Sequence, residues 1–301
     1  MQPQAVVVGA RQATAFARRG PLSATEVDEV APYRLTRHVH SGGVFDLFRA
    51  AARGDAGPGC YVLKRARDGV SPEMAAAMLR REATVAAAVQ HPSLTCVLAA
   101  ETRSPQPYLL LPFRDGVSLR QMLALSDAFI SVSRALNIVR QVAEALAALH
   151  AAGWLHGQVR PDHVLLSPQG QVTVIDLMRA RRRETAECDV ADVAAIDAIY
   201  AAPEMSQHGR RQDSAIDVYS LGVALFEILT GRPPFECSSP RELMIKHRRD
   251  AVPDIRAARP DVTLEVAHLL RLMLAKDSLR RPTDEELVRW LAELEIAALA
   301  L

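Results

Sequence analysis

Two short stretches in the middle of the chain carry the side chains best suited to chemistry. The first runs from His156 to Leu166, with the sequence HGQVRPDHVLL. The second, Asp176 to Met178, begins ten residues later. A carboxylate such as that of Asp176 can ligate a hard metal ion. The amide of Gln158 can hydrogen-bond a hydroxyl group, but it cannot act as a base near neutral pH.

A second pair of charged residues lies upstream of these stretches. Lys64 ends the apolar stretch YVLK, and Glu82 follows eighteen residues later in a predicted helix. Taken alone, a lysine at the end of a strand is usually a surface residue.

These motifs and their spacing resemble those of the protein kinase family. The family has a catalytic loop of the pattern H-R-D-L-K-P-x-N-I-L-L, followed by the metal-binding turn D-F-G. Its glycine-rich loop, G-x-G-x-x-G-x-V, corresponds here to HSGGVFDL at residues 40–47. The resemblance covers about residues 33–296, and bacterial serine/threonine kinases look most similar. It implies an α+β fold with two lobes, in which a small antiparallel-sheet N-lobe with one helix precedes a larger helical C-lobe.

The resemblance also implies a role for each matching residue. Lys64 would hold the α- and β-phosphates of ATP and pair with Glu82, and Asp176 would ligate Mg²⁺. Leu111 would be the gatekeeper, and backbone groups of Phe113 and its neighbours would bond adenine. Arg160 replaces the loop lysine, where it would bind phosphate or neutralise Asp176. The implied cofactor-binding set is Gly42, Gly43, Val62, Lys64, Glu82, Leu111, Phe113, Leu165 and Asp176.

The residues that perform the chemistry in the family are changed in this chain. Gln158 replaces the catalytic aspartate, and His163 replaces the metal-binding asparagine. The loss of a positioned base costs about 10² to 10⁴ in rate. An imidazole nitrogen is also a poor ligand for a hard cation. In the glycine-rich loop, Phe45 replaces a glycine and would place a ring where the loop tip covers the phosphates. ATP binding, with or without Mg²⁺, is therefore predicted to be weak or absent.

Three functions remain open from these residues. The favoured one is a pseudokinase that acts as a protein-binding scaffold or allosteric module, which leaves open whether the chain is an enzyme at all. The alternative is a low-activity serine/threonine protein kinase, or another nucleotide-dependent transferase, that uses Lys64 and Asp176. The third is a binder of a different small ligand in the altered cleft.

Composition argues against several other classes of protein. The chain has 301 residues, 49% of them apolar, and a formal net charge of +1. Nucleic-acid binding requires a basic surface, and a membrane span requires an apolar run of about 18 residues, neither of which occurs here. The four cysteines are scattered, which is typical of a reducing compartment. We expect a cytoplasmic protein with protein partners and no nucleic-acid or membrane partner.

The chain divides into three predicted segments: an N-terminal extension (1–32), an N-lobe (33–113) and a C-lobe (114–301). Strands are predicted in the N-lobe at residues 45–51, 60–64 and 108–111, with a helix at 71–89. Helices are predicted in the C-lobe at residues 133–152, 217–230, 241–249, 264–274 and 283–298.

Overall fold

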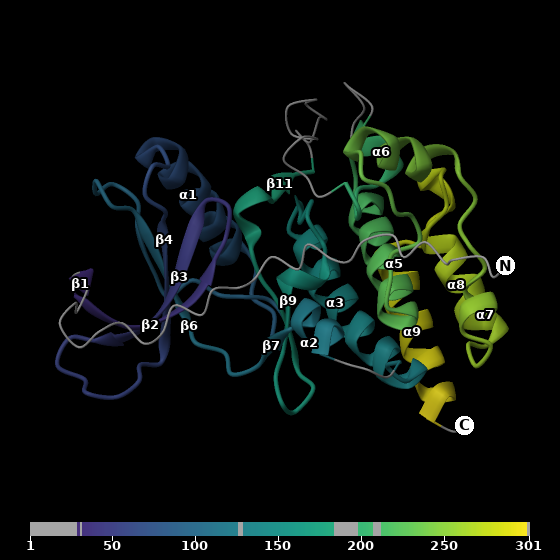
Figure 1. Ribbon diagram of the computed structural model, residues 1–301, viewed down its shortest axis with the longest axis horizontal. Coiled ribbons are helices and arrows are strands. Elements are labelled where there is room, and N and C mark those ends of the chain that lie inside the picture. The colour runs from purple at the N-terminus through teal and green to yellow at the C-terminus, as the bar shows by residue number, and fades with distance from the viewer. Residues whose placement is uncertain (1–28, 31, 126–128, 184–197, 207–211, 300–301) are drawn as a thin grey trace, which may run out of the picture.

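The computed structural model describes residues 29–30, 32–125, 129–183, 198–206 and 212–299. Within these ranges the chain forms a sheet-rich lobe and a helical lobe that lie side by side (Figure 1). This arrangement confirms the two-lobed α+β fold predicted from the sequence.

The N-lobe is built on a six-stranded sheet with the strand order β1-β2-β3-β4-β6-β5 and antiparallel pairing. The sheet begins at Glu29, so two residues of the predicted extension belong to it, whereas residues 1–28 lie outside the described residues. The strands are β1 (Glu29–Val30), β2 (Tyr33–Ser41), β3 (Phe45–Ala52), β4 (Tyr61–Ala66), β5 (Ala99–Glu101) and β6 (Tyr108–Pro112).

The long helix of the N-lobe, α1 (Pro72–Ala88), begins where the sequence predicts it. The side chain of Ser71 accepts a hydrogen bond from the N–H of Met74, and Pro72 occupies the first turn, where its missing N–H costs nothing. The buried face of the helix includes Leu79 and Glu82. The helix therefore carries Glu82 into the interior of the lobe.

The C-lobe is mostly helical and is organised around α5, which is buried along nearly its whole length. Two small sheets accompany the helices, with the strand orders β10-β9-β7 and β11-β8. No helix within the described ranges is long and apolar enough to cross a membrane. The helices are α2 (Leu119–Leu125), α3 (Val132–Ala151), α5 (Ala215–Thr230), α6 (Pro240–Arg249), α7 (Ile255–Ala258), α8 (Leu264–Met273) and α9 (Asp284–Leu299). The short strands are β7 (Val117–Ser118), β8 (Trp154–Leu155), β9 (Val164–Leu166), β10 (Val172–Val174) and β11 (Arg181–Arg182), and 3₁₀ turns span Pro161–His163, Leu177–Arg179, Pro203–Ser206 and Ser278–Arg280.

Asp217, in the first turn of α5, ties this helix to the loop that begins at His156. Its carboxylate accepts the backbone N–H groups of His156 and Gly157 at 2.7 and 2.8 Å. His150 lies between Asp217 and Asp284, with its ring nitrogens 2.9 and 2.8 Å from their oxygens. Burial opposes a charged imidazole, but the two carboxylates outweigh it and raise the pKa of His150 to about 9. His150 is therefore a buried cation that holds the carboxylate supporting the loop.

The pKa of His150 predicts that the protein loses stability as the pH rises from 6.5 to about 9. The folded chain keeps this proton up to about pH 9, whereas an unfolded histidine loses it near 6.5. The stabilisation is therefore complete below 6.5 and disappears above the folded pKa, with an upper limit of about 3 kcal/mol. Urea unfolding across this range should show a steeper loss for the native chain than for the variant His150→Gln. Equal losses would contradict this role of His150.

Candidate functional site

A buried lysine joins two carboxylates at the junction of the lobes. Lys64 Nζ, on β4, donates to Glu82 Oε2 of α1 at 2.6 Å and to Asp176 Oδ1 at 2.8 Å. The predicted ion pair between Lys64 and Glu82 is thus present. Burial opposes the charge of Lys64, but Asp176 and Glu82 outweigh it and raise its pKa. Burial likewise opposes an ionised Asp176, but Lys64 and then His163 lower the pKa of that carboxyl group. Burial raises the pKa of Glu82, with Lys64 opposing it. Lys64 and Asp176 are therefore the two groups whose charged forms this arrangement favours.

Asp176 has a left-handed backbone, with φ 70° and ψ 62°, and no other non-glycine residue in the described ranges has a positive φ. This conformation is uncommon for a residue with a Cβ. It directs the carboxylate toward Lys64 and places Leu177, which is fully buried, behind it. The turn thus adopts an unfavourable backbone conformation at Asp176, and this conformation places the carboxylate in the site.

His163 faces the second oxygen of Asp176. Its Nε2 lies 3.1 Å from Asp176 Oδ2, and its Nδ1 lies 2.8 Å from the carbonyl oxygen of Gln158. A carbonyl oxygen can only accept, so we assign the proton of the neutral ring to Nδ1. Burial lowers the pKa of His163 to about 4, with Asp176 opposing it. At neutral pH a nitrogen lone pair therefore faces a carboxylate.

This donor set does not fit Mg²⁺. Magnesium requires near-octahedral oxygen ligands, whereas one carboxylate oxygen here is bonded to Lys64 and the other faces an imidazole nitrogen. A nitrogen and an oxygen at this separation suit a cation with affinity for imidazole better. Within the described residues, no group of three or more His, Cys, Asp or Glu side chains is placed to hold a metal ion.

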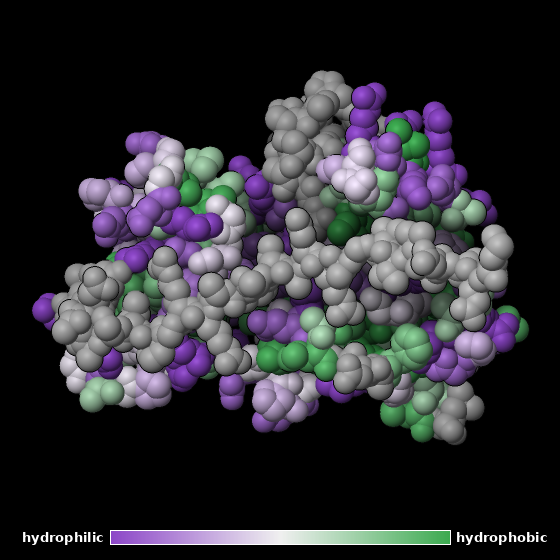
Figure 2. Space-filling model, viewed as in Figure 1, coloured by the Kyte–Doolittle hydropathy of each residue, from purple (hydrophilic) through white to green (hydrophobic). Residues whose placement is uncertain are grey.

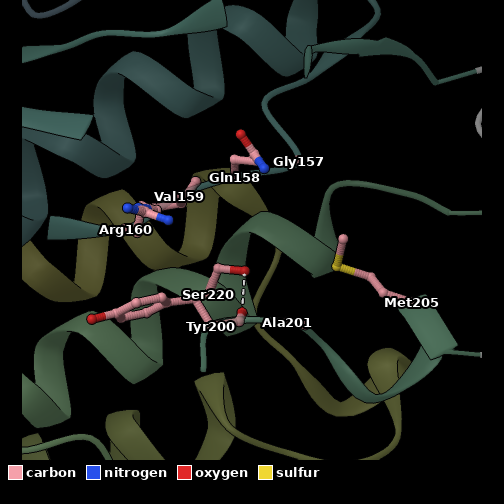
Figure 3. Close-up of a pocket in the computed structure, with 8 residues that line it drawn as sticks. All are labelled: Gly157, Gln158, Val159, Arg160, Tyr200, Ala201, Met205 and Ser220. Atoms are coloured by element: carbon pink, nitrogen blue, oxygen red, sulfur yellow. Dashed lines mark hydrogen bonds between the residues drawn. The ribbon is translucent and has the colours of Figure 1, made fainter. Parts of the chain in front are cut away.

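Gln158 and Arg160 line a small cavity under the loop (Figure 3). The N–H of Gln158 donates to His156 Nδ1 at 3.2 Å. Arg160 Nε lies 3.3 Å from Asp162 Oδ2, so its charge is placed beside Asp162. The cavity has a volume of about 10 Å³, which is space for about one water molecule. The opposite wall carries Tyr200, whose carbonyl oxygen accepts the hydroxyl of Ser220 at 2.7 Å (Figure 3). A substrate side chain does not fit this cavity without movement of its walls.

The glycine-rich loop is a tight turn between β2 and β3. The N–H of Gly42 donates to the carbonyl oxygen of Phe45 at 2.8 Å, so it is used within the turn and not for a phosphate. A Cβ at Gly42 would lie 3.2 Å from that same oxygen, whereas one at Gly43 would meet nothing within 4 Å. Of the two glycines, only Gly42 would thus bring a Cβ into a tight contact, and that contact lies within the turn itself.

The position of Phe45 differs from the prediction. Its ring does not cover the phosphate region from the loop tip. It is 4% exposed and packs into the lobe interior against Leu79 and Leu109. Lys64 Nζ lies 5.1 Å from the centre of this ring. The physical reason is the hydrophobic effect: burial of an aromatic ring beneath the hairpin lowers the free energy of the fold more than its exposure over a polar cleft would.

The residues predicted to surround adenine lie where the two lobes join. Val62 pairs with Leu111 across β4 and β6, and both are half-buried. The N–H of Phe113 donates to the carbonyl oxygen of Cys60 at 2.8 Å, so this N–H bonds the neighbouring strand instead of adenine. Leu165, on β9, is also half-buried. Val62 and Leu111 are thus neighbours across the sheet, and the binding of adenine by backbone groups near Phe113 stays a prediction.

Sequence reasoning did not anticipate an ionic cluster beside the loop. Arg120 of α2 lies 2.5 Å from Glu227 of α5 and 3.4 Å from Asp162. The hydroxyl of Tyr200 bonds both Arg120 and Glu227, which fixes Tyr200 on the wall of the cavity. Asp162 belongs to the loop that begins at His156, but Arg120, Tyr200 and Glu227 belong to none of the motifs described above, so only the fold brings the four together.

The fold and the site together define the class of protein. The protein kinase domain model matches residues 41–290, which is most of the chain. The chain therefore belongs to the protein kinase family. ATP with Mg²⁺ is the usual nucleotide of this family, in which the metal bridges phosphate oxygens and offsets their charge.

Similar proteins are bacterial serine/threonine kinases. Serine/threonine-protein kinase PknB of Mycolicibacterium smegmatis is 38% identical over 205 residues, which cover 66% of this chain and 32% of that protein. The probable serine/threonine-protein kinase pknA2 of Bifidobacterium longum is 28% identical over 276 residues, covering 88% of this chain and 36% of the relative. A probable PknB of Lactococcus lactis is 27% identical over 256 residues, which are 84% and 40% of the two chains. This chain thus spans between about a third and two fifths of the length of these relatives.

The charge balance at Lys64 predicts a large loss of stability when the lysine is removed. In Lys64→Met, the carboxylates of Glu82 and Asp176 remain buried without their shared cation. Removal of one partner from a buried ion pair typically costs about 3–5 kcal/mol. Urea unfolding should show this loss, which should diminish at low pH as the carboxylates become protonated. The matched control is Lys246→Met, a half-exposed lysine of α6, for which a change of less than about 1 kcal/mol is expected. Similar losses in the two variants would contradict this account.

Proposed function

We propose that this chain is a pseudokinase that acts as a protein-binding scaffold or allosteric module, with weak or absent ATP binding. The observation that carries the proposal is the amide of Gln158, which stands at the position of the catalytic base. The loop around it is fully supported by Asp217, so the loop is formed without the group that performs the family's reaction. An amide cannot take the proton of a substrate hydroxyl near neutral pH.

The phosphate side of the cleft supports the same proposal. The N–H of Gly42 is used within its own turn, and Oδ1 of Asp176 is already bonded to Lys64. A nucleotide would have to displace these contacts before its phosphates were bound. The free energy of displacement is subtracted from that of binding, so affinity is low.

The alternative function is a low-activity serine/threonine protein kinase, or another nucleotide-dependent transferase, that uses Lys64 and Asp176. The names of the similar proteins, all serine/threonine kinases, support this alternative better than they support a scaffold. The intact pair of Lys64 and Glu82 also favours it, because this lysine contacts phosphates in active kinases. The two functions differ in one measurable quantity, the transfer of a phosphoryl or nucleotidyl group.

Calorimetry with ATP tests the occupancy of the cleft. We expect a Kd weaker than about 100 µM, which corresponds to less than about 5.5 kcal/mol of binding free energy. Mg²⁺ should not tighten binding, because the donor set does not suit it. Lys64→Ala should abolish any heat that is observed. Micromolar binding that depends on Mg²⁺ would contradict the proposed state of the site, and heat that survives in Lys64→Ala would place the nucleotide elsewhere.

Transfer of labelled phosphate from ATP to a protein separates the two candidate functions. The native chain should show none, whereas the double variant Gln158→Asp/His163→Asn restores a base and an oxygen ligand. If the rest of the site can bind ATP and substrate, the rate of phosphoryl transfer by this variant should exceed that of the native chain by up to about 10² to 10⁴. Transfer by the native chain that is abolished in Asp176→Ala would establish the alternative. A parallel assay with ATP labelled at the α-phosphate would identify nucleotidyl transfer, in which AMP is joined to the protein and pyrophosphate leaves.

A further inference from the structure

A groove with a volume of about 430 Å³ lies where the segment after α5 meets α7. None of its lining residues belongs to the site described above. Its volume is within the range of about 300–1,000 Å³ that is typical of ligand pockets. The groove is lined by Phe226, Thr230, Arg232, Pro233, Pro234, Glu236, Pro253, Asp254, Ala257 and Ala258. Figure 1 shows α5 and α7 in the same part of the C-lobe, and Figure 2 shows the surface of this lobe from the same side.

The walls of the groove offer carbon surfaces and few hydrogen-bond donors. Pro233, Pro234 and Pro253 have no backbone N–H. The hydroxyl of Thr230 is already bonded, at 2.8 Å each, to the carbonyl oxygens of Phe226 and Arg232. An occupant that needs donors from the protein would be poorly bound here. An apolar ring packed against the prolines would be bound well.

The rim of the groove carries more acceptors than donors. Glu236 and Asp254 are exposed, and Arg232 is the one cation among the lining residues. Asp254 uses one oxygen to accept the N–H of Arg256 as the helix cap of α7, which leaves its second oxygen facing solvent or an occupant. Arg259 does not neutralise this rim, because its buried guanidinium is paired with Asp261 and with backbone carbonyl oxygens. The charge pattern favours an occupant that brings a cation.

We propose that this groove docks an extended segment of a partner protein in which an aromatic residue is adjacent to lysine or arginine. The ring would lie on the walls formed by Pro233 and Pro253, and the cation would lie between Glu236 and Asp254. Aromatic residues and arginine are the side chains that most often dominate protein interfaces. The inference deepens the proposed scaffold function and rests on it for the existence of a protein partner.

Fluorescence anisotropy with short labelled peptides tests the docking site. The probe contains one tryptophan beside one arginine, and its two matched peptides have alanine in place of the tryptophan or glutamate in place of the arginine. We expect the probe to bind the native chain with a Kd of about 10–100 µM and each matched peptide to bind at least about tenfold more weakly. Peptides that all bind alike, or no binding by the probe up to about 1 mM, would overturn the proposal.

Variants of the chain locate the probe on the surface. Ala257→Trp fills the groove and should abolish binding, and Glu236→Lys reverses the charge of the rim and should weaken it by about fivefold or more. The matched control is Glu293→Lys, the same charge reversal on an exposed position of α9, which should change the Kd by less than about twofold. Thermal unfolding verifies that each variant is folded. If Ala257→Trp bound the probe as tightly as the native chain does, the groove would be excluded as the binding site of the probe.

The outcomes separate this inference from the proposed function. Ala257→Trp leaves Lys64 and Gln158 unchanged, so its ATP calorimetry should repeat that of the native chain. A chain that transfers no phosphate and binds no probe overturns the docking site alone. A chain that transfers phosphate and binds the probe overturns the pseudokinase proposal and keeps the groove.

Discussion

The organisation of this molecule depends on one buried carboxylate, that of Asp217. It holds two consecutive N–H groups at the start of the loop and is itself held by His150. A second buried interaction, between Glu204 and Arg281 at 2.6 and 2.9 Å, ties the segment after the loop to the end of the C-lobe. Neither contact involves a substrate. The loop is therefore supported by contacts that do not depend on the side chain of residue 158, which is here an amide.

The joint between the lobes has a similar independence from ligands. One ammonium group satisfies a carboxylate from α1 and another from the turn at Asp176, and the second carboxylate also faces His163. Groups that would meet phosphate and metal in an active kinase are thus paired with one another within the protein. Such internal balance stabilises the lobes against each other, because an unpaired charge here would be buried at high cost.

Much of the fold could be predicted because its elements carry local signals. The helix at Ser71 has its cap and its proline, and α3 and α5 have apolar spacing that ends at glycine. The strand β2 was missed because it is largely exposed and carries polar side chains, so its alternation is weak. At the site, the spacing of the motifs predicted the partnership of Lys64 with Glu82. It could not predict the inward ring of Phe45 or the bonded N–H of Gly42, because both follow from packing and turn geometry that arise only when the hairpin folds.

The burial of Phe45 restricts which residues its position can hold. A glycine at this position would remove one aromatic side chain of packing from the small lobe, a change that typically costs about 3–5 kcal/mol. That is a large share of the net stability of an ordinary domain, about 5–15 kcal/mol. Conversion of this turn to the glycine-rich pattern of the family would therefore require further substitutions that refill the interior of the lobe.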